Sequence, residues 1–201
     1  MKYRSTTLFV VLCALLVVLF VVDLLVGSVS IPLRDIFAAL LGGEVTPSTR
    51  LIVVDIRLVK AVVAVLAGMA LSVSGLQMQT LFRNPLAGPY VLGISSGASL
   101  GVALFILGMP LLGIATSSTI SSLGTAGAAW LGSALILAFV ASVSTRIKDI
   151  MVILILGMMI SSGVSAVVQI LQYLSNEEAL KSFVIWTMGS LGDVTSSQLM
   201  L

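Results

Sequence analysis

The sequence contains no histidine, one cysteine and few charged residues. Among its 201 residues, 9% are charged and 59% are hydrophobic, and the mean hydropathy is +1.22. Soluble domains carry about 25% charged residues, and so few charges cannot cover a soluble core of this size. The lone Cys13 excludes an intrachain disulfide, and the lack of histidine removes the commonest metal ligand and proton shuttle. The composition therefore predicts a membrane protein.

Several kinds of chemistry lack their sequence signals. No Asp, Glu or His lies deep in a long apolar run, whereas ion-coupled carriers usually place such residues within the membrane. The chain has neither the HExxH zinc-protease motif nor the phosphate-binding GxxxxGK[ST] motif. The net charge of +2 comes without a basic stripe, so nothing indicates nucleic-acid binding. We expect a chain that is not an enzyme, binds no metal or cofactor, and is either a passive channel or driven by a partner.

The intervals between charged residues predict five membrane spans and one short helix, an all-α polytopic membrane bundle. A span needs about 20 apolar residues. As one helix, the charge-free interval from 84 to 145 would be about three bilayers long, so we expect it to fold back between Pro110 and Ser122. The expected spans lie near 5–26, 61–82, 91–109, 124–144 and 150–173, and the short helix lies near 182–191.

The first apolar run is interpreted as a span, because residues 5–22 exceed the roughly 7–15 residues of a signal-peptide core. A weak small-residue site at 26–28 keeps cleavage as the alternative. Lys and Arg are evenly divided between the two sides, and the tight loops at Arg83 and Arg146 favour a cytoplasmic N-terminus. After the first span, SIPLRDIFAALL predicts a short amphipathic helix with Ser30 as its N-cap.

Small residues recur at helical spacing in two of the expected spans. The two series are Gly93, Gly97 and Gly101, and then Gly124, Ala128 and Gly132. Such stripes let helix backbones approach closely in lipid, so they predict helix packing. The alternative is that glycine is simply common in membrane helices.

The segment LFRNPLAGPYVLGISSGASLG, residues 81–101, interrupts the apolar runs with four glycines, two prolines and three serines. Pro85 and Pro89 disfavour a helix at the residues before them, which predicts a short, stiff loop between the second and third spans. Asn84 can pair with freed backbone groups or line an aqueous path. A plain turn with a cytoplasmic arginine is the alternative.

A longer segment, RLVKAVVAVLAGMALSVSGLQMQTLFRNPLAGPYVLGISSGASLG at residues 57–101, resembles the hallmark segment of the FecCD-type permeases. These are the membrane subunits of ABC importers for iron-siderophore chelates, heme and cobalamin. The family pattern Q-x-x-x-x-N-P-L-A-x-P is kept from Gln79 to Pro89, and L-G-I-S-x-G-A is kept from Leu92 to Ala98. DIFAALLGG and WTMGSLGDVTSSQL add weaker similarity on either side.

The resemblance implies that residues 1–201 are the N-terminal part of one permease domain of roughly ten spans, in the cytoplasmic (inner) membrane. Such permeases work in pairs, here expected to be a homodimer. Their partners are two ABC ATPase subunits that use ATP and a periplasmic or lipid-anchored solute-binding protein. The implied function is import of an iron chelate (siderophore) by alternating access, with heme or cobalamin as the alternative cargo. An ion-coupled secondary transporter and a non-transport membrane anchor stay open as other classes. The family's ATPase-coupling helix belongs to the second half, so we expect these residues alone not to transport.

The family's basic R-L-P-R motif faces the binding protein at the outer mouth, and it matches Arg57 and Lys60. This sequence departs from the motif twice, because Val59 replaces the proline and Lys60 replaces the second arginine. A lysine keeps the charge but lacks the two parallel N–H donors with which arginine binds a carboxylate. Docking is therefore assigned first to Arg57. The alternative is an interfacial basic pair that anchors the second span.

Two further placements follow from the resemblance. The family's N-P-L loop contributes to a cytoplasmic gate, and it matches Asn84, Pro85 and Leu86. The family's fifth span lines the pathway, and the polar candidates there are Ser161, Ser162, Ser165 and Gln169. These four cannot all face one pore, and serine in a membrane helix often bonds its own backbone instead.

Overall fold

The computed structural model describes residues 2–111, 113, 118–147, 149–192, 194 and 199. All regular secondary structure among these residues is helical, which confirms the predicted all-α class. The chain divides into two compact units, one of residues 1–70 with 190–201 and the other of residues 71–189. Each unit is described by itself.

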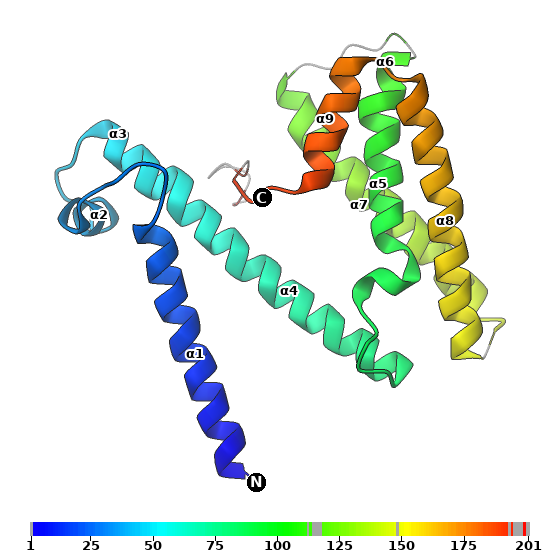
Figure 1. The fold of residues 1–201 in the computed structure, drawn as a ribbon, viewed down its shortest axis with the longest axis horizontal. Coiled ribbons are helices and arrows are strands. Elements are labelled where there is room, and N and C mark those ends of the chain that lie inside the picture. The colour runs from blue at the N-terminus through cyan, green and yellow to red at the C-terminus, as the bar shows by residue number, and fades with distance from the viewer. Residues whose placement is uncertain are drawn as a thin grey trace. The chain divides into compact units, whose positions relative to one another are not determined.

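The first unit holds α1 (Lys2–Leu25), α2 (Leu33–Leu40), α3 (Pro47–Arg50), η1 (Leu51–Leu58) and the start of α4 (Val59–Phe82), as Figure 1 shows. The η1 segment is a π-helical stretch that joins α3 to α4 without a break. Its buried Val53 packs with Ile36 and Ala39 of α2. The expected Ser30 cap is wrong, because Pro32 occupies the N-cap position and no side chain bonds there.

The second unit begins with the rest of α4 and continues through the helices that follow it, as far as Gly189. After the 3-10 turn η2 (Pro89–Leu92) come α5 (Ile94–Ala103), the π-helical η3 (Leu104–Gly108) and α6 (Met109–Leu111). Then follow α7 (Ser118–Ser144), α8 (Ile150–Leu174) and α9 (Glu177–Met188). α5 contacts α7, α8 and α9 (Figure 1) and so forms the centre of this unit.

Glycines bring α5 and α7 into backbone contact. A β-carbon added at Gly101 would lie 2.0 Å from the Ala128 carbonyl oxygen, and one at Gly132 would lie 2.1 Å from the Gly97 oxygen. Both clashes are with backbone, which cannot turn away as a side chain can. Gly93 differs from the rest of its series, because it precedes α5 with a left-handed φ of +78° and faces α8.

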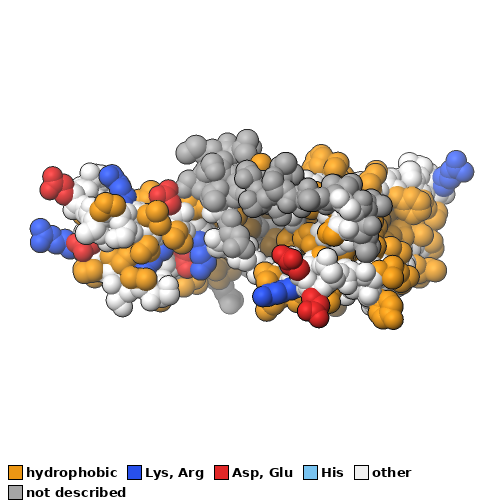
Figure 2. All heavy atoms as spheres, turned by 90° about the horizontal axis from the view of Figure 1, so that it is seen from above, with side chains coloured by type: hydrophobic (Ala, Val, Ile, Leu, Met, Phe, Trp, Pro, Cys, Tyr) orange, Lys and Arg blue, Asp and Glu red, His pale blue; other side chains and the backbone are white. Residues whose placement is uncertain are grey.

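Three described helical segments are long and apolar enough to cross a membrane: Thr6–Leu25, Leu123–Ser144 and Ile150–Leu174. The apolar stretch Ile94–Gly108 is shorter. Figure 2 shows hydrophobic side chains over much of the described surface on the face that it presents. Part of the expected bend between Pro110 and Ser122, at 112 and 114–117, lies outside the described residues, and the polar run from Ser118 to Ser122 is already the start of α7. The last helix starts at Glu177, earlier than the expected 182, because the Asn176 side chain accepts a hydrogen bond from the Ala179 N–H and caps it.

Candidate functional site

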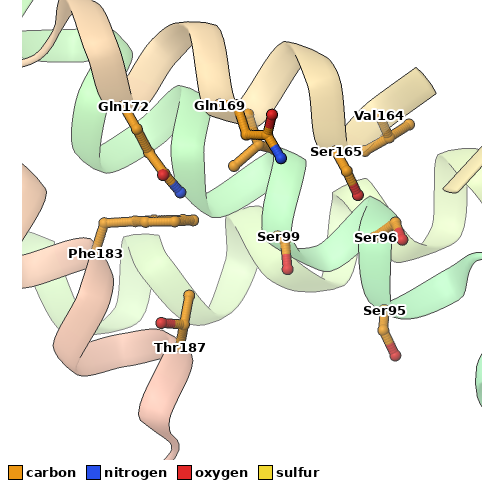
Figure 3. A pocket seen from close by; sticks show the side chains of 10 residues that line it. Ser95, Ser96, Ser99, Val164, Ser165, Gln169, Gln172, Phe183 and Thr187 are labelled. Carbon is orange, nitrogen blue, oxygen red and sulfur yellow. The ribbon is translucent and has the colours of Figure 1, made fainter. Parts of the chain in front are cut away.

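A cavity of about 360 Å³ in the second unit collects uncharged polar side chains from three helices (Figure 3). α5 contributes three serines, α8 contributes a serine and two glutamines, and α9 contributes a threonine and a phenylalanine. The lining residues are Ser95, Ser96, Ser99, Val164, Ser165, Val168, Gln169, Gln172, Phe183 and Thr187. No acidic or basic side chain is among them.

Helical spacing explains why these residues meet. On α8, Ser165 and Gln169 are four residues apart and Gln172 follows three residues later, so all three lie along one stripe. On α5, Ser95 and Ser99 share a stripe in the same way. The contact between α5 and α8 turns these two stripes toward the same space (Figure 3).

Most hydroxyls and amides that line the cavity are not hydrogen-bonded to the part of the chain that the structure describes. Thr187 donates to the Val184 carbonyl oxygen at 2.7 Å. The other polar side chains that line the cavity make no hydrogen bond to any residue that the structure describes. An unpaired polar group within a bilayer costs several kcal/mol by transfer estimates of about 2–7. The cavity is therefore suited to water or to a ligand that accepts and donates hydrogen bonds.

One wall of the cavity is apolar and firmly packed. Phe183 of α9 is only 2% exposed and belongs to a buried cluster with Val102, Leu107 and Val168. Its ring stacks on Trp186 with centroids 6.2 Å apart and an interplanar angle of 28°. This packing holds α9 beside α5 and η3.

The predicted pathway residues separate into two groups. Ser165 and Gln169 line the cavity. Ser161 does not, because its hydroxyl donates to the Gly157 carbonyl oxygen at 2.9 Å and lies against Gly93. Ser162 is exposed and donates to the Met158 oxygen at 3.0 Å. The pathway role of the first pair stays a prediction.

Sequence reasoning missed five polar lining residues of the cavity: Ser95, Ser96, Ser99, Gln172 and Thr187. A signal for the three serines was present, since they lie close together at the start of an otherwise apolar helix. The contribution of α9 had no comparable signal, because its closeness to α5 depends on the tertiary fold.

The predicted gate loop is a tight turn organised by Asn84. Its side-chain oxygen accepts a hydrogen bond from the Leu86 N–H at 2.9 Å, and its carbonyl oxygen accepts one from the Ala87 N–H at 3.1 Å. Arg83 adopts a left-handed φ of +46°, which is uncommon for a residue other than glycine. Pro85 and Leu86 are exposed, while Ala87 is buried. The turn fits a gate that is held in one shape, and the gating role itself stays a prediction.

The two predicted docking residues lie in contrasting surroundings. Arg57 is buried, with 7% of its surface exposed, and its guanidinium donates to carbonyl oxygens in the first unit. Lys60 is exposed. The sequence ranks Arg57 above Lys60 as the docking residue, but Lys60 is the more accessible of the two. Docking stays a prediction, and it now concerns Lys60 first.

Metal-ligating side chains do not cluster in the described part of the chain, where no three His, Cys, Asp or Glu residues come together. What the site can do is therefore a matter of hydrogen bonding through neutral groups.

The chain is similar to membrane subunits of known transport systems. It is 34% identical over 185 residues to the molybdate import system permease protein MolB of Haemophilus influenzae, covering 89% of this chain and 52% of that protein. It is 38% identical over 148 residues to the hemin transport system permease protein HmuU of Yersinia pestis, covering 73% and 43%. The chain thus spans about half the length of these curated relatives.

A solved structure of an ABC transporter is also similar to this chain. It is described as an inward-facing conformation of a metal-chelate type ABC transporter, and it matches with a TM-score of 0.77 and 29% identity. The match covers 97% of this chain and 57% of that one. The profile of the FecCD transport family matches residues 15–201. The chain therefore belongs to the FecCD transport family, whose members include membrane permease subunits of ABC transporters.

Proposed function

We propose that these residues are the N-terminal part of a permease that imports an iron chelate of the siderophore type, with heme or cobalamin as the alternative cargo within the family. The observation that supports this most is the cavity of uncommitted, uncharged hydrogen-bonding groups. The surface of an iron chelate is rich in oxygen atoms that accept hydrogen bonds. Neutral hydroxyls and amides bind such a surface weakly, which allows the cargo to leave again.

The same cavity is poorly suited to a bare metal ion. A bare cation needs convergent carbonyls or charged side chains to replace its water shell, and the lining has no carboxylate. The hemin relative and the metal-chelate structure point in the same direction, since both are named for a chelated metal.

The proposal includes partners and a place in the cell. The complete permease would pair with a second copy in the inner membrane, with its N-terminus in the cytoplasm. Two ATPase subunits would hydrolyse ATP on that side, and a solute-binding protein would deliver the cargo from the other. Their binding would shift the permease between outward-open and inward-open states, because each partner prefers one state.

One observation favours a second candidate, molybdate. The Haemophilus influenzae relative is named for molybdate and its match covers 89% of this chain. A tetrahedral oxyanion also accepts hydrogen bonds from hydroxyls and amides, and the cavity places no carboxylate against it.

Uptake by the full-length permease with its own ATPase and binding protein separates these candidates. The host strain would lack its siderophore, hemin, cobalamin and molybdate importers, and each labelled cargo would be supplied alone. We expect ATP-dependent uptake of an iron-siderophore. Uptake of molybdate alone would replace the chelate proposal with the oxyanion, and uptake of none would refute the assigned function.

A further inference from the structure

The guanidinium of Arg57 lies among the backbone carbonyls that end α1. It donates to the Leu24 oxygen at 3.0 Å and to the Leu25 oxygen at 3.2 Å. It also donates to the oxygen of Val29, in the loop after the helix. One side chain thus joins η1 to the end of α1 and to the loop that follows it.

The ends of helices explain why a cation belongs at this place. The last carbonyls of an α-helix have no partner within the helix, and they carry the negative end of the helix dipole. A planar guanidinium has five N–H donors and can serve several carbonyls at once. A lysine ammonium has three donors on one atom and cannot reach such spread acceptors in the same way.

Gly27 leaves the space that this arrangement needs. A β-carbon at Gly27 would lie 2.5 Å from Nη2 of Arg57 and 2.7 Å from its Cζ. Any larger residue would therefore displace the guanidinium from its carbonyls. Gly27 and Arg57 are thirty positions apart in sequence, and the guanidinium keeps its present position because residue 27 has no β-carbon.

The burial of Arg57 also removes it from the surface. Arg57 and Val53, four residues apart on η1, both lie on the buried side, while Lys60 is exposed. A cation whose donors already bond to the chain's own backbone is not available to a carboxylate on another protein.

We propose that Arg57 and Gly27 form a clamp that positions the end of α1 and its following loop against η1. Arg57 is then a positioning residue. It shapes the docking surface by holding the end of α1 and the loop after it, whereas Lys60 presents the accessible charge. Only the docking part of this inference rests on the proposed function.

The test uses the full-length permease in detergent, with Cys13→Ser and a nitroxide label on Val29→Cys. The variants are Arg57→Ala, Arg57→Lys, Gly27→Ala and Lys60→Ala. Gly68→Ala is the matched glycine control, because a β-carbon there would meet nothing within 4 Å. Two quantities are measured, the mobility of the label and the salt-dependent affinity for the binding protein.

A clamp predicts that Gly27→Ala and Arg57→Ala mobilise the label alike, and that Arg57→Lys restores little. It also predicts that Gly27→Ala lowers the affinity of the permease for the binding protein severalfold, although every charge is kept. Lys60→Ala should lower the same affinity without mobilising the label. The clamp is refuted if Gly27→Ala matches Gly68→Ala, or if the label stays immobile without Arg57. Should even the unsubstituted permease bind no binding protein, the proposed function fails, and label mobility still decides the clamp.

Discussion

A serine hydroxyl in a membrane helix can donate to a carbonyl one turn earlier or remain open to what lies beside the helix. α8 contains both kinds. Ser161 and Ser162 donate to Gly157 and Met158, and their hydrogen-bonding capacity is largely used within the helix. Ser165 makes no such bond among the described residues and faces the cavity instead. Residue type alone therefore does not identify the serines that meet a cargo.

Replacing these serines separates the two kinds. We expect Ser165→Ala to reduce cargo uptake by the full-length transporter about fivefold, since a neutral hydrogen bond contributes about 1 kcal/mol. Ser162→Ala is the matched control on the same helix, and it should leave uptake unchanged because its hydroxyl is already bonded to the backbone. The measurement is the initial rate of uptake at equal amounts of permease in the membrane. Equal losses from both variants would remove Ser165 from the pathway.

The predicted gate turn depends on one side-chain oxygen. Asn84→Asp keeps an acceptor for the Leu86 N–H, whereas Asn84→Ala leaves that N–H unpaired. We expect the alanine variant to loosen the turn by about 1 kcal/mol and to raise cargo leakage through the reconstituted permease in the absence of ATP. The aspartate variant should stay tight. If leakage rises equally in both variants, the hydrogen bond between Asn84 and the Leu86 N–H does not keep the permease closed.

At the scale of helices, contact between α5 and α7 depends on the absence of side chains. We expect Gly132→Ala to destabilise the permease by about 1–3 kcal/mol, because its β-carbon would overlap the Gly97 carbonyl oxygen, which is fixed in a helix. Gly127→Ala is the control on the same helix, since a β-carbon there meets nothing within 4 Å. Thermal unfolding in detergent measures both. If the two variants unfold at the same temperature, this helix contact does not have the described form.

The helices themselves could be predicted from charge and apolar length alone, because lipid requires long runs without charge. The structure has a helix in each of the five intervals, including α4 at Val59–Phe82 and α8 at Ile150–Leu174. The environment of single residues could not be predicted in this way. The sequence predicts Arg57 as a docking cation at the outer mouth. The structure buries it instead, because it donates hydrogen bonds to carbonyls some thirty positions away in the sequence. The cavity likewise joins α5, α8 and α9, whose proximity no local pattern encodes.

At the scale of the whole molecule, the distribution of charge supports the proposed dependence on ATPase partners. α7 and α8 contain no Asp, Glu, Lys or Arg, and the cavity between α5, α8 and α9 is lined by neutral groups. An ion-coupled carrier needs a group that binds the coupling ion or proton near the cargo. A permease that responds to ATPase partners needs no such group, because the partners supply the difference in affinity between its two states.

This difference gives a prediction for the complete transporter in cells or proteoliposomes. We expect cargo uptake to continue when an ionophore collapses the proton and sodium gradients while ATP is held constant. We expect it to stop when the ATPase partner carries a substitution in its phosphate-binding lysine, with the gradients intact. The control is a known gradient-driven carrier in the same membranes, whose uptake the ionophore should abolish. Uptake that follows the gradient at constant ATP would place the coupling group elsewhere in the protein and assign the transporter to the secondary class.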